Sequence, residues 1–166
     1  MDKDGRTAAK GLIIDEFLDY LLSHKFFSKE PPKSTGRDEF GVDVYLKDAL
    51  ANRQDYSFED LMATVTEAVG RGIADAYNRF IRPDHEIHHV IVSGGGAMNR
   101  TLMKILKTRL TGVKVYTSDQ YGIPYNAREA IAFAILGNET ICGTPANVPS
   151  ATGASHAAIL GKITLA

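Results

Sequence analysis

The chain has 166 residues, of which 44% are hydrophobic and 23% charged, and its net charge is -1. This balance is typical of one globular domain and predicts no strongly basic face, so we expect no nucleic-acid partner. No apolar run approaches the ~20 residues of a membrane span. A single cysteine, Cys142, excludes an internal disulfide and fits a cytoplasmic protein.

The first half of the chain is predicted to be helical. Apolar residues at helical spacing predict an amphipathic helix over residues 10–27, which ends before Pro31 and Pro32. Residues 29–41 then form a loop, and residues 43–51 a short helix. The clearest helix begins after Ser57, a good N-cap residue, and ends before Pro83. Its predicted inward residues are Leu61, Met62, Val65, Val69, Ile73, Tyr77 and Phe80.

The second half alternates strands and helices. Residues 88–92 form a β-branched run typical of a buried strand, a helix is predicted over residues 99–110, and residues 113–117 form a second strand. Such a unit is right-handed, so its two strands should be parallel. Residues 127–141 predict a small-residue helix that packs on the sheet. For residues 157–164 a closing strand and a terminal segment both remain open.

A glycine triplet lies between the first predicted strand and the following helix. In Ser93-Gly94-Gly95-Gly96-Ala97-Met98-Asn99, glycine would let the backbone approach a ligand, and the helix N-terminus favours phosphate. Asn99 could hydrogen-bond a ribose or a base. The alternatives are a tight turn without a ligand and an NAD(P)-binding loop. The latter would use Gly94, Gly96 and Asp119, but Asn99 stands where its third glycine should be.

Two further segments carry polar residues suited to ligands. Lys33-Ser34-Thr35-Gly36-Arg37 offers two cations and two hydroxyls for an anion or for a contact between lobes, although a solvated loop explains it equally. Glu129 opens a predicted helix, where it either complements the helix dipole or binds sugar hydroxyls. The histidines show no metal-site spacing, so we expect no metal held by the protein alone. Cys142 is interpreted as a packed small residue rather than a nucleophile.

Four segments and the tail together resemble one family, anhydro-N-acetylmuramic acid kinase of bacterial cell-wall recycling. The similarity spans essentially the whole chain, with its motifs in order. The segments are Asp2 to Gly5 running into Ala8 to Gly11; Pro32 to Phe40; Val92 to Asn99 with Leu102 and Met103; Gly122 to Pro124 with Glu129 to Ala134; and the tail from Gly143 to Ala154.

The resemblance implies a fold and a reaction. It implies the C-terminal lobe of an actin-like (ribonuclease H-like) ATPase fold over residues 1–166, α/β in class, with helices packed on a mostly parallel sheet. ATP, assisted by Mg²⁺, would phosphorylate the 6-oxygen of 1,6-anhydro-N-acetylmuramic acid while water opens the anhydro ring. The residues implied are Gly94, Gly95, Gly96, Ala97 and Asn99 for the nucleotide, Glu129 for the sugar, and Lys33, Thr35 and Arg37 at the cleft or hinge.

One motif of the family has no counterpart here. The resemblance places the general base in an Asp-Thr-Gly-Pro-Gly-Asn type motif, preceding the segment that starts at Met1. It places the phosphate-binding loop and most sugar contacts in an N-terminal lobe. We therefore expect a fragment that holds no catalytic base, is inactive alone and is able to form a homodimer through its exposed lobe face. A non-catalytic nucleotide-binding module of the same superfamily is the remaining alternative.

Overall fold

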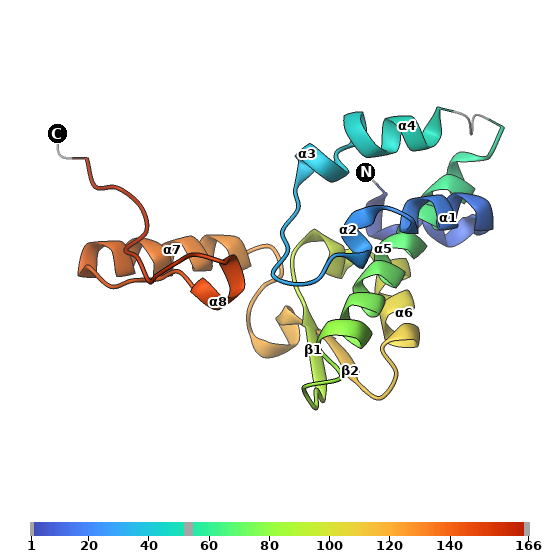
Figure 1. Cartoon of the computed structure of the whole chain (residues 1–166). Coiled ribbons are helices and arrows are strands. Elements are labelled where there is room, and N and C mark those ends of the chain that lie inside the picture. The colour runs from blue at the N-terminus through green and yellow to red at the C-terminus, as the bar shows by residue number, and fades with distance from the viewer. Residues whose placement is uncertain (1, 52–54, 165–166) are drawn as a thin grey trace.

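The structure, a computed structural model, describes residues 2–51 and 55–164, so the expectation about Met1 falls outside it. Figure 1 shows a body in which helices pack on one side of a small sheet, and one helix that extends away from this body. The elements are α1 (Asp15–Leu22), α2 (Lys25–Ser28), α3 (Arg37–Phe40), α4 (Lys47–Leu50), α5 (Phe58–Phe80), β1 (His89–Val92), α6 (Arg100–Arg109), β2 (Lys114–Thr117), α7 (Arg128–Cys142) and α8 (Pro149–Thr152). Single turns of 3₁₀-helix at Lys3–Gly5, Ala8–Lys10, Gly95–Met98 and Ser118–Tyr121, and a π-turn at Val42–Leu46, complete the set.

Helix α5 is the central element of the body, and its predicted ends are confirmed. The Ser57 hydroxyl accepts a hydrogen bond from Asp60 N at 3.1 Å, as an N-cap residue should. The predicted inward face is only partly right, because Val69 and Ile73 are 46% and 45% exposed. Helix α5 instead meets α6 through small residues. At Gly70 an added Cβ would lie 2.4 Å from Ile105 Cγ2, so the absence of a side chain here lets α6 approach α5 closely.

The first helix is shorter than predicted, because the residues before it bond to α5. Leu12 N donates to Asp60 Oδ1 at 2.6 Å, and Ile14 N donates to Thr64 Oγ1 at 3.0 Å. Gly11 lies against the backbone of Glu59, where a Cβ would meet the carbonyl oxygen at 2.0 Å. Because these backbone N–H groups bond to side chains of α5, helix α1 begins only at Asp15, and the Leu12 side chain is exposed.

The bond between Leu12 and Asp60 predicts an acid-sensitive contribution to stability. The Leu12 N–H, and next the Ser57 side chain, hold the pKa of the Asp60 carboxyl below its ordinary value of 3.8. A depressed folded-state pKa stabilises the fold above the unfolded pKa and loses this effect as pH falls through the folded value. The stability difference between wild type and Asp60→Asn should therefore narrow below about pH 4. Urea unfolding at several pH values measures it, and a difference independent of pH would contradict this account.

Strands β1 and β2 are parallel, as predicted, with Val90 opposite Val115 and Val92 opposite Thr117. One face of this sheet joins α5 and α6 in a core. Its buried members are Ala74, Tyr77, Leu102, Met103, Leu106, Leu110 and Val115. The other face is open, and Ile91 is 51% exposed, so the prediction of a buried strand is wrong. Within the described ranges the sheet has only these two strands, and no helix covers its second face.

Helix α7 does not pack on the sheet, in contrast to the prediction. None of its residues, all of which the structure describes, is buried, and Figure 1 shows it extending away from the body. The tail folds back along it, since Thr140 Oγ1 donates to Leu160 O at 2.6 Å and Ala158 N donates to Asn147 Oδ1 at 2.7 Å. Residues 157–164 thus form a terminal segment without a strand. Cys142 is exposed rather than packed.

Candidate functional site

The glycine loop, residues 93–99, leaves the carboxyl end of β1 and enters α6. Gly94 has φ +81°, a left-handed conformation that favours glycine, and its N–H donates to Tyr125 O at 3.1 Å. Gly95 lies outside that region, and a Cβ added there would meet nothing within 4 Å. At Gly96 the nearest atom would be Leu102 Cδ2, at an ordinary 3.6 Å. The fold therefore requires glycine at position 94 but gives no internal reason for it at 95 or 96.

Ala97 and Asn99 anchor this loop to the body. Ala97 is 8% exposed, so its side chain faces the interior and packs under the loop's backbone on the side of the body. Asn99 is the N-cap of α6, with Oδ1 accepting a hydrogen bond from Leu102 N at 3.0 Å. This local role explains an asparagine at position 99 without a ligand. Its predicted bond to a ribose or base remains a prediction.

A second loop follows β2 and supports the first. Asp119 Oδ1 accepts a bond from Tyr125 N at 3.4 Å, and Tyr125 O in turn accepts the N–H of Gly94. Asp119 thus stabilises its own loop. This structural role explains an aspartate at position 119 without the ribose contact that the dinucleotide alternative requires. Ser118 was not singled out from the sequence. Among the described residues its hydroxyl is a buried side-chain group without a hydrogen-bond partner.

Glu129 lies a few residues after Tyr125, the residue that is hydrogen-bonded to the glycine loop. It lies in the first turn of α7 and is exposed, four residues after the Tyr125 carbonyl that holds Gly94. The structure therefore joins the start of α7 to the glycine loop. A carboxylate in this position complements the positive end of the helix dipole and remains accessible to a ligand.

Lys33, Thr35 and Arg37 lie elsewhere and have internal roles. Lys33 Nζ donates to Phe26 O at 3.1 Å and lies 4.8 Å from the ring centroids of Phe26 and of Phe80. Thr35 Oγ1 donates to Glu39 Oε2 at 2.8 Å, and Arg37 is an exposed residue that opens α3. Lys33 and Thr35 border an apolar cavity of about 490 Å³ between α5 and the aromatic residues of α2 and α3, and residues 93–99 do not line it.

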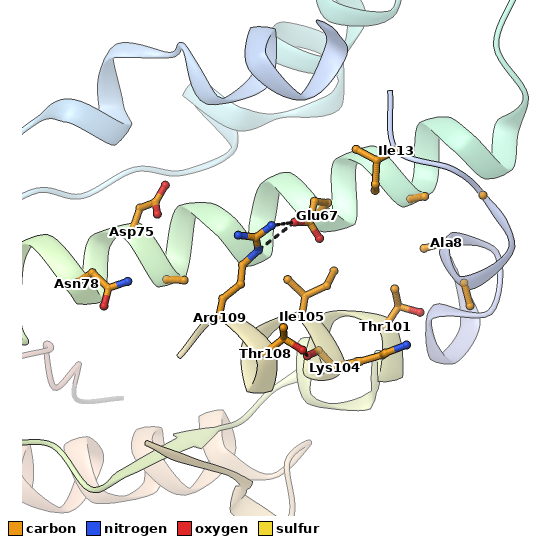
Figure 2. Close-up of a pocket in the computed structure, with 14 residues that line it drawn as sticks. Ala8, Ile13, Glu67, Asp75, Asn78, Thr101, Lys104, Ile105, Thr108 and Arg109 are labelled. Atoms are coloured by element: carbon orange, nitrogen blue, oxygen red, sulfur yellow. Dashed lines mark hydrogen bonds and ion pairs between the residues drawn. The ribbon is translucent and has the colours of Figure 1, made fainter. Parts of the chain in front are cut away.

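A second cavity, of about 580 Å³, lies between α5 and α6 (Figure 2). Its centre is Glu67, whose Oε1 accepts bonds from Arg71 Nε at 3.0 Å and from Arg109 Nε at 2.9 Å. The two arginines neutralise this largely buried carboxylate and join the two helices. Thr101, in the first turn of α6, also lines the cavity, which therefore extends along α6 from Arg109 to the start of this helix.

A glycine loop that joins parallel strands to a helix N-terminus defines the class of α/β proteins with a candidate nucleotide- or phosphate-binding loop. The particular family follows from sequence comparison. The profile of the family described as "Anhydro-N-acetylmuramic acid kinase" matches residues 1–166, and the chain belongs to this family. No helix of the described residues has the length and apolar character that crossing a membrane requires.

Curated relatives named "Anhydro-N-acetylmuramic acid kinase" match nearly the whole chain. The protein of Bacillus cereus (strain G9842) is 43% identical over 165 residues, which are 98% of this chain and 43% of that protein. That of Caldanaerobacter subterraneus subsp. tengcongensis is 42% identical over 167 residues, 99% of this chain and 42% of the relative. That of Clostridioides difficile (strain 630) is 47% identical over 163 residues, 98% and 42% respectively. The chain thus spans less than half the length of these relatives.

Proposed function

We propose that this chain supplies the adenosine-binding lobe of an anhydro sugar kinase with an actin-like fold. The reaction would transfer the terminal phosphoryl group of ATP to the 6-oxygen of 1,6-anhydro-N-acetylmuramic acid. Water would open the anhydro ring, which gives N-acetylmuramate 6-phosphate. Family membership and the names of the relatives support this reaction. The α/β arrangement, with α5 and α6 on one face of a parallel strand pair, is compatible with such a lobe.

One observation in particular supports nucleotide binding at the glycine loop. Gly95 and Gly96 have neither a left-handed backbone nor a neighbour that a Cβ would displace. A glycine in the first turn of a helical segment costs conformational entropy and gives the fold nothing in return. Close approach of a ligand to the bare backbone gives these two glycines a purpose. The N–H groups at the start of α6 would then favour the anionic phosphates, with Ala97 and Asn99 supporting the loop.

The sugar and hinge residues have weaker support from the geometry. Glu129 would hydrogen-bond sugar hydroxyls, because it is exposed and lies just after the loop that holds Gly94. Lys33, Thr35 and Arg37 would act at the hinge between lobes, since the partners of Lys33 and Thr35 are internal rather than at the glycine loop. Both roles rest on the resemblance to the family, and residues 93–99 do not line the cavity that Lys33 and Thr35 border.

Magnesium would be bound mainly through the nucleotide. Among residues 2–51 and 55–164 no group of three or more histidine, cysteine, aspartate or glutamate side chains could hold a metal ion. Mg²⁺ commonly uses one or two carboxylates together with substrate phosphates and water, so a kinase needs no such group of side chains in this lobe. The motif to which the family assigns the general base does not occur in the printed sequence. We therefore expect negligible kinase turnover by this polypeptide alone.

The two alternatives are less well supported. A dinucleotide site needs Asp119 to bind a ribose, but its carboxylate holds the backbone of Tyr125. A purely non-catalytic module is at odds with relatives that are all named as kinases. A homodimer through the apolar surface of α7 remains part of the proposal, because Phe133 and Ile141 there are 66% and 78% exposed.

Calorimetric titration of the purified chain with ADP, ATP–Mg²⁺ and NAD⁺ tests the proposal. We expect weak binding of both adenine nucleotides at the same site, with ADP displaced by ATP, and no binding of NAD⁺. NAD⁺ binding in the absence of ATP binding would favour the dinucleotide alternative. A chain that binds none of the three would contradict the claim that this lobe holds the nucleotide by itself.

A further inference from the structure

The N-terminal turn, residues 2–11, packs against the start of α6. Thr101 Oγ1 donates a hydrogen bond to Gly5 O at 2.7 Å, although the two residues are 96 positions apart in sequence. Gly5 is buried, and Ala8 in the same turn is 3% exposed. The turn therefore lies directly beside the first turn of α6, which follows Asn99 at the end of the glycine loop.

Gly5 fits this place because it has no side chain. Its φ is +73°, and an added Cβ would lie 2.0 Å from Asn99 Oδ1 and 2.8 Å from Asn99 Cγ. Such distances do not occur between real atoms, so either the turn or the asparagine would have to move. Asn99 is not free to move without cost, because the same Oδ1 caps Leu102 N at 3.0 Å. Gly5 thus leaves Asn99 just enough room for its capping conformation.

The turn that carries Gly5 is itself firmly held. The Asp2 carboxylate accepts bonds from Thr7 N at 2.8 Å and from Ala8 N at 3.0 Å. Burial alone would raise the pKa of Asp2, but these bonds outweigh it and hold the pKa below its ordinary value of 3.8. At the other end of the turn, the N–H of Leu12 is bound by Asp60 of α5. The turn is thus held internally by Asp2 and tied to α5 through Leu12, and its Gly5 lies against Asn99.

We propose that Gly5 is a positioning residue of the glycine loop, acting through Asn99, and that the N-terminal turn thereby sets the nucleotide affinity of the site. This inference rests on the proposed function, in which the glycine loop and the α6 N-terminus hold the nucleotide. Asn99 lies between the N-terminal turn and the glycine loop. A shift of its side chain would therefore leave Leu102 N uncapped and displace Gly95 and Gly96. Because the ligand meets backbone groups of preorganised geometry, a small displacement of these groups weakens binding.

Substitutions at positions 5 and 99 test the coupling. Gly5→Ala should weaken ADP binding by about tenfold or more, which corresponds to roughly 1.4 kcal/mol. Asn99→Ser keeps a capping hydroxyl but removes the two nearest of the three atoms that an alanine at position 5 would meet, the third being Thr101 N at 3.0 Å. Because Asn99 belongs to the proposed binding loop, the affinity of Asn99→Ser itself is the reference for the double variant. The double variant Gly5→Ala/Asn99→Ser should recover the affinity of Asn99→Ser. A matched control is Gly112→Ala, because Gly112 has a similar φ of +81° but nothing within 4 Å.

Each variant is titrated with ADP below its unfolding temperature, and hydrogen exchange of the Leu102 amide is followed without ligand. Gly5→Ala should accelerate this exchange, and Asn99→Ser should restore the protection. Lower stability of Gly5→Ala with unchanged ADP affinity, or no recovery in the double variant, would overturn the inference. If wild type binds no ADP, the proposed function fails instead. Exchange at Leu102 then still decides the Gly5–Asn99 coupling, and exchange unaffected by Gly5→Ala would refute it.

Discussion

Leu106→Ala is expected to lower the free energy of unfolding by about 2–5 kcal/mol. Leu106 is 1% exposed and lies in the core that joins α5, α6 and the strand pair, with Tyr77, Leu110 and Val115 as other members. Its removal leaves a cavity under α6, the helix whose first turn receives the glycine loop. Equilibrium unfolding in urea measures the loss, and the midpoint should fall without a change of slope.

The matched control is Ile135→Ala on α7. Ile135 is 57% exposed, so its truncation should change stability by no more than about 0.5 kcal/mol. A loss as large as that of Leu106→Ala that did not depend on protein concentration would contradict the account, because it would mean that α7 packs on the body of its own chain. A loss that grew with protein concentration would instead support the proposed homodimer through α7.

Local patterns predicted the elements whose ends depend on neighbouring residues. The cap at Ser57 and the stop before Pro83 follow from signals within a few residues. The parallel pairing of β1 with β2 follows from the continuous strand–helix–strand pattern of residues 88–117. Elements governed by distant contacts were predicted less well. The start of α1 depends on Asp60 and Thr64 of α5, which no local pattern reveals.

Helix α7 differs from the prediction for another reason. Its small and apolar residues indicated packing on the sheet, but in the structure they contact little besides the tail of the chain. Periodicity shows that a helix has an apolar face, but it does not show which other part of the molecule packs against that face. In α5 the same limit appears at Val69 and Ile73, which are 46% and 45% exposed although they belong to the predicted inward face.

For the candidate site, the sequence located the glycine loop but did not predict the N-cap at Asn99. The binding roles assigned to the residues of this loop stay predictions. An asparagine just before a helix is a common N-cap, and that local signal could have predicted the role of Asn99. The contacts of Gly5 with Asn99, and of Gly94 with Tyr125, join segments far apart in the chain. They could be found only once the chain was folded.

Gly95→Val should abolish nucleotide binding while leaving the fold intact. The valine would enter open space, with no atom of the protein within 4 Å of its Cβ, so stability should stay within about 1 kcal/mol of wild type. The same side chain would occupy the position where a nucleotide meets the bare backbone. We expect a loss of ADP affinity of about 100-fold, which corresponds to roughly 2.7 kcal/mol.

The control for this substitution is Gly137→Val on α7. Gly137 also has nothing within 4 Å of an added Cβ and lies outside the left-handed region. It belongs to α7, the helix that Figure 1 shows extending away from the body. The most direct test of the account is a calorimetric titration of wild type, Gly95→Val and Gly137→Val with ADP at one temperature below all unfolding midpoints. The account predicts binding by wild type and Gly137→Val and none by Gly95→Val. Undiminished ADP binding by a folded Gly95→Val variant would contradict it and place the nucleotide elsewhere.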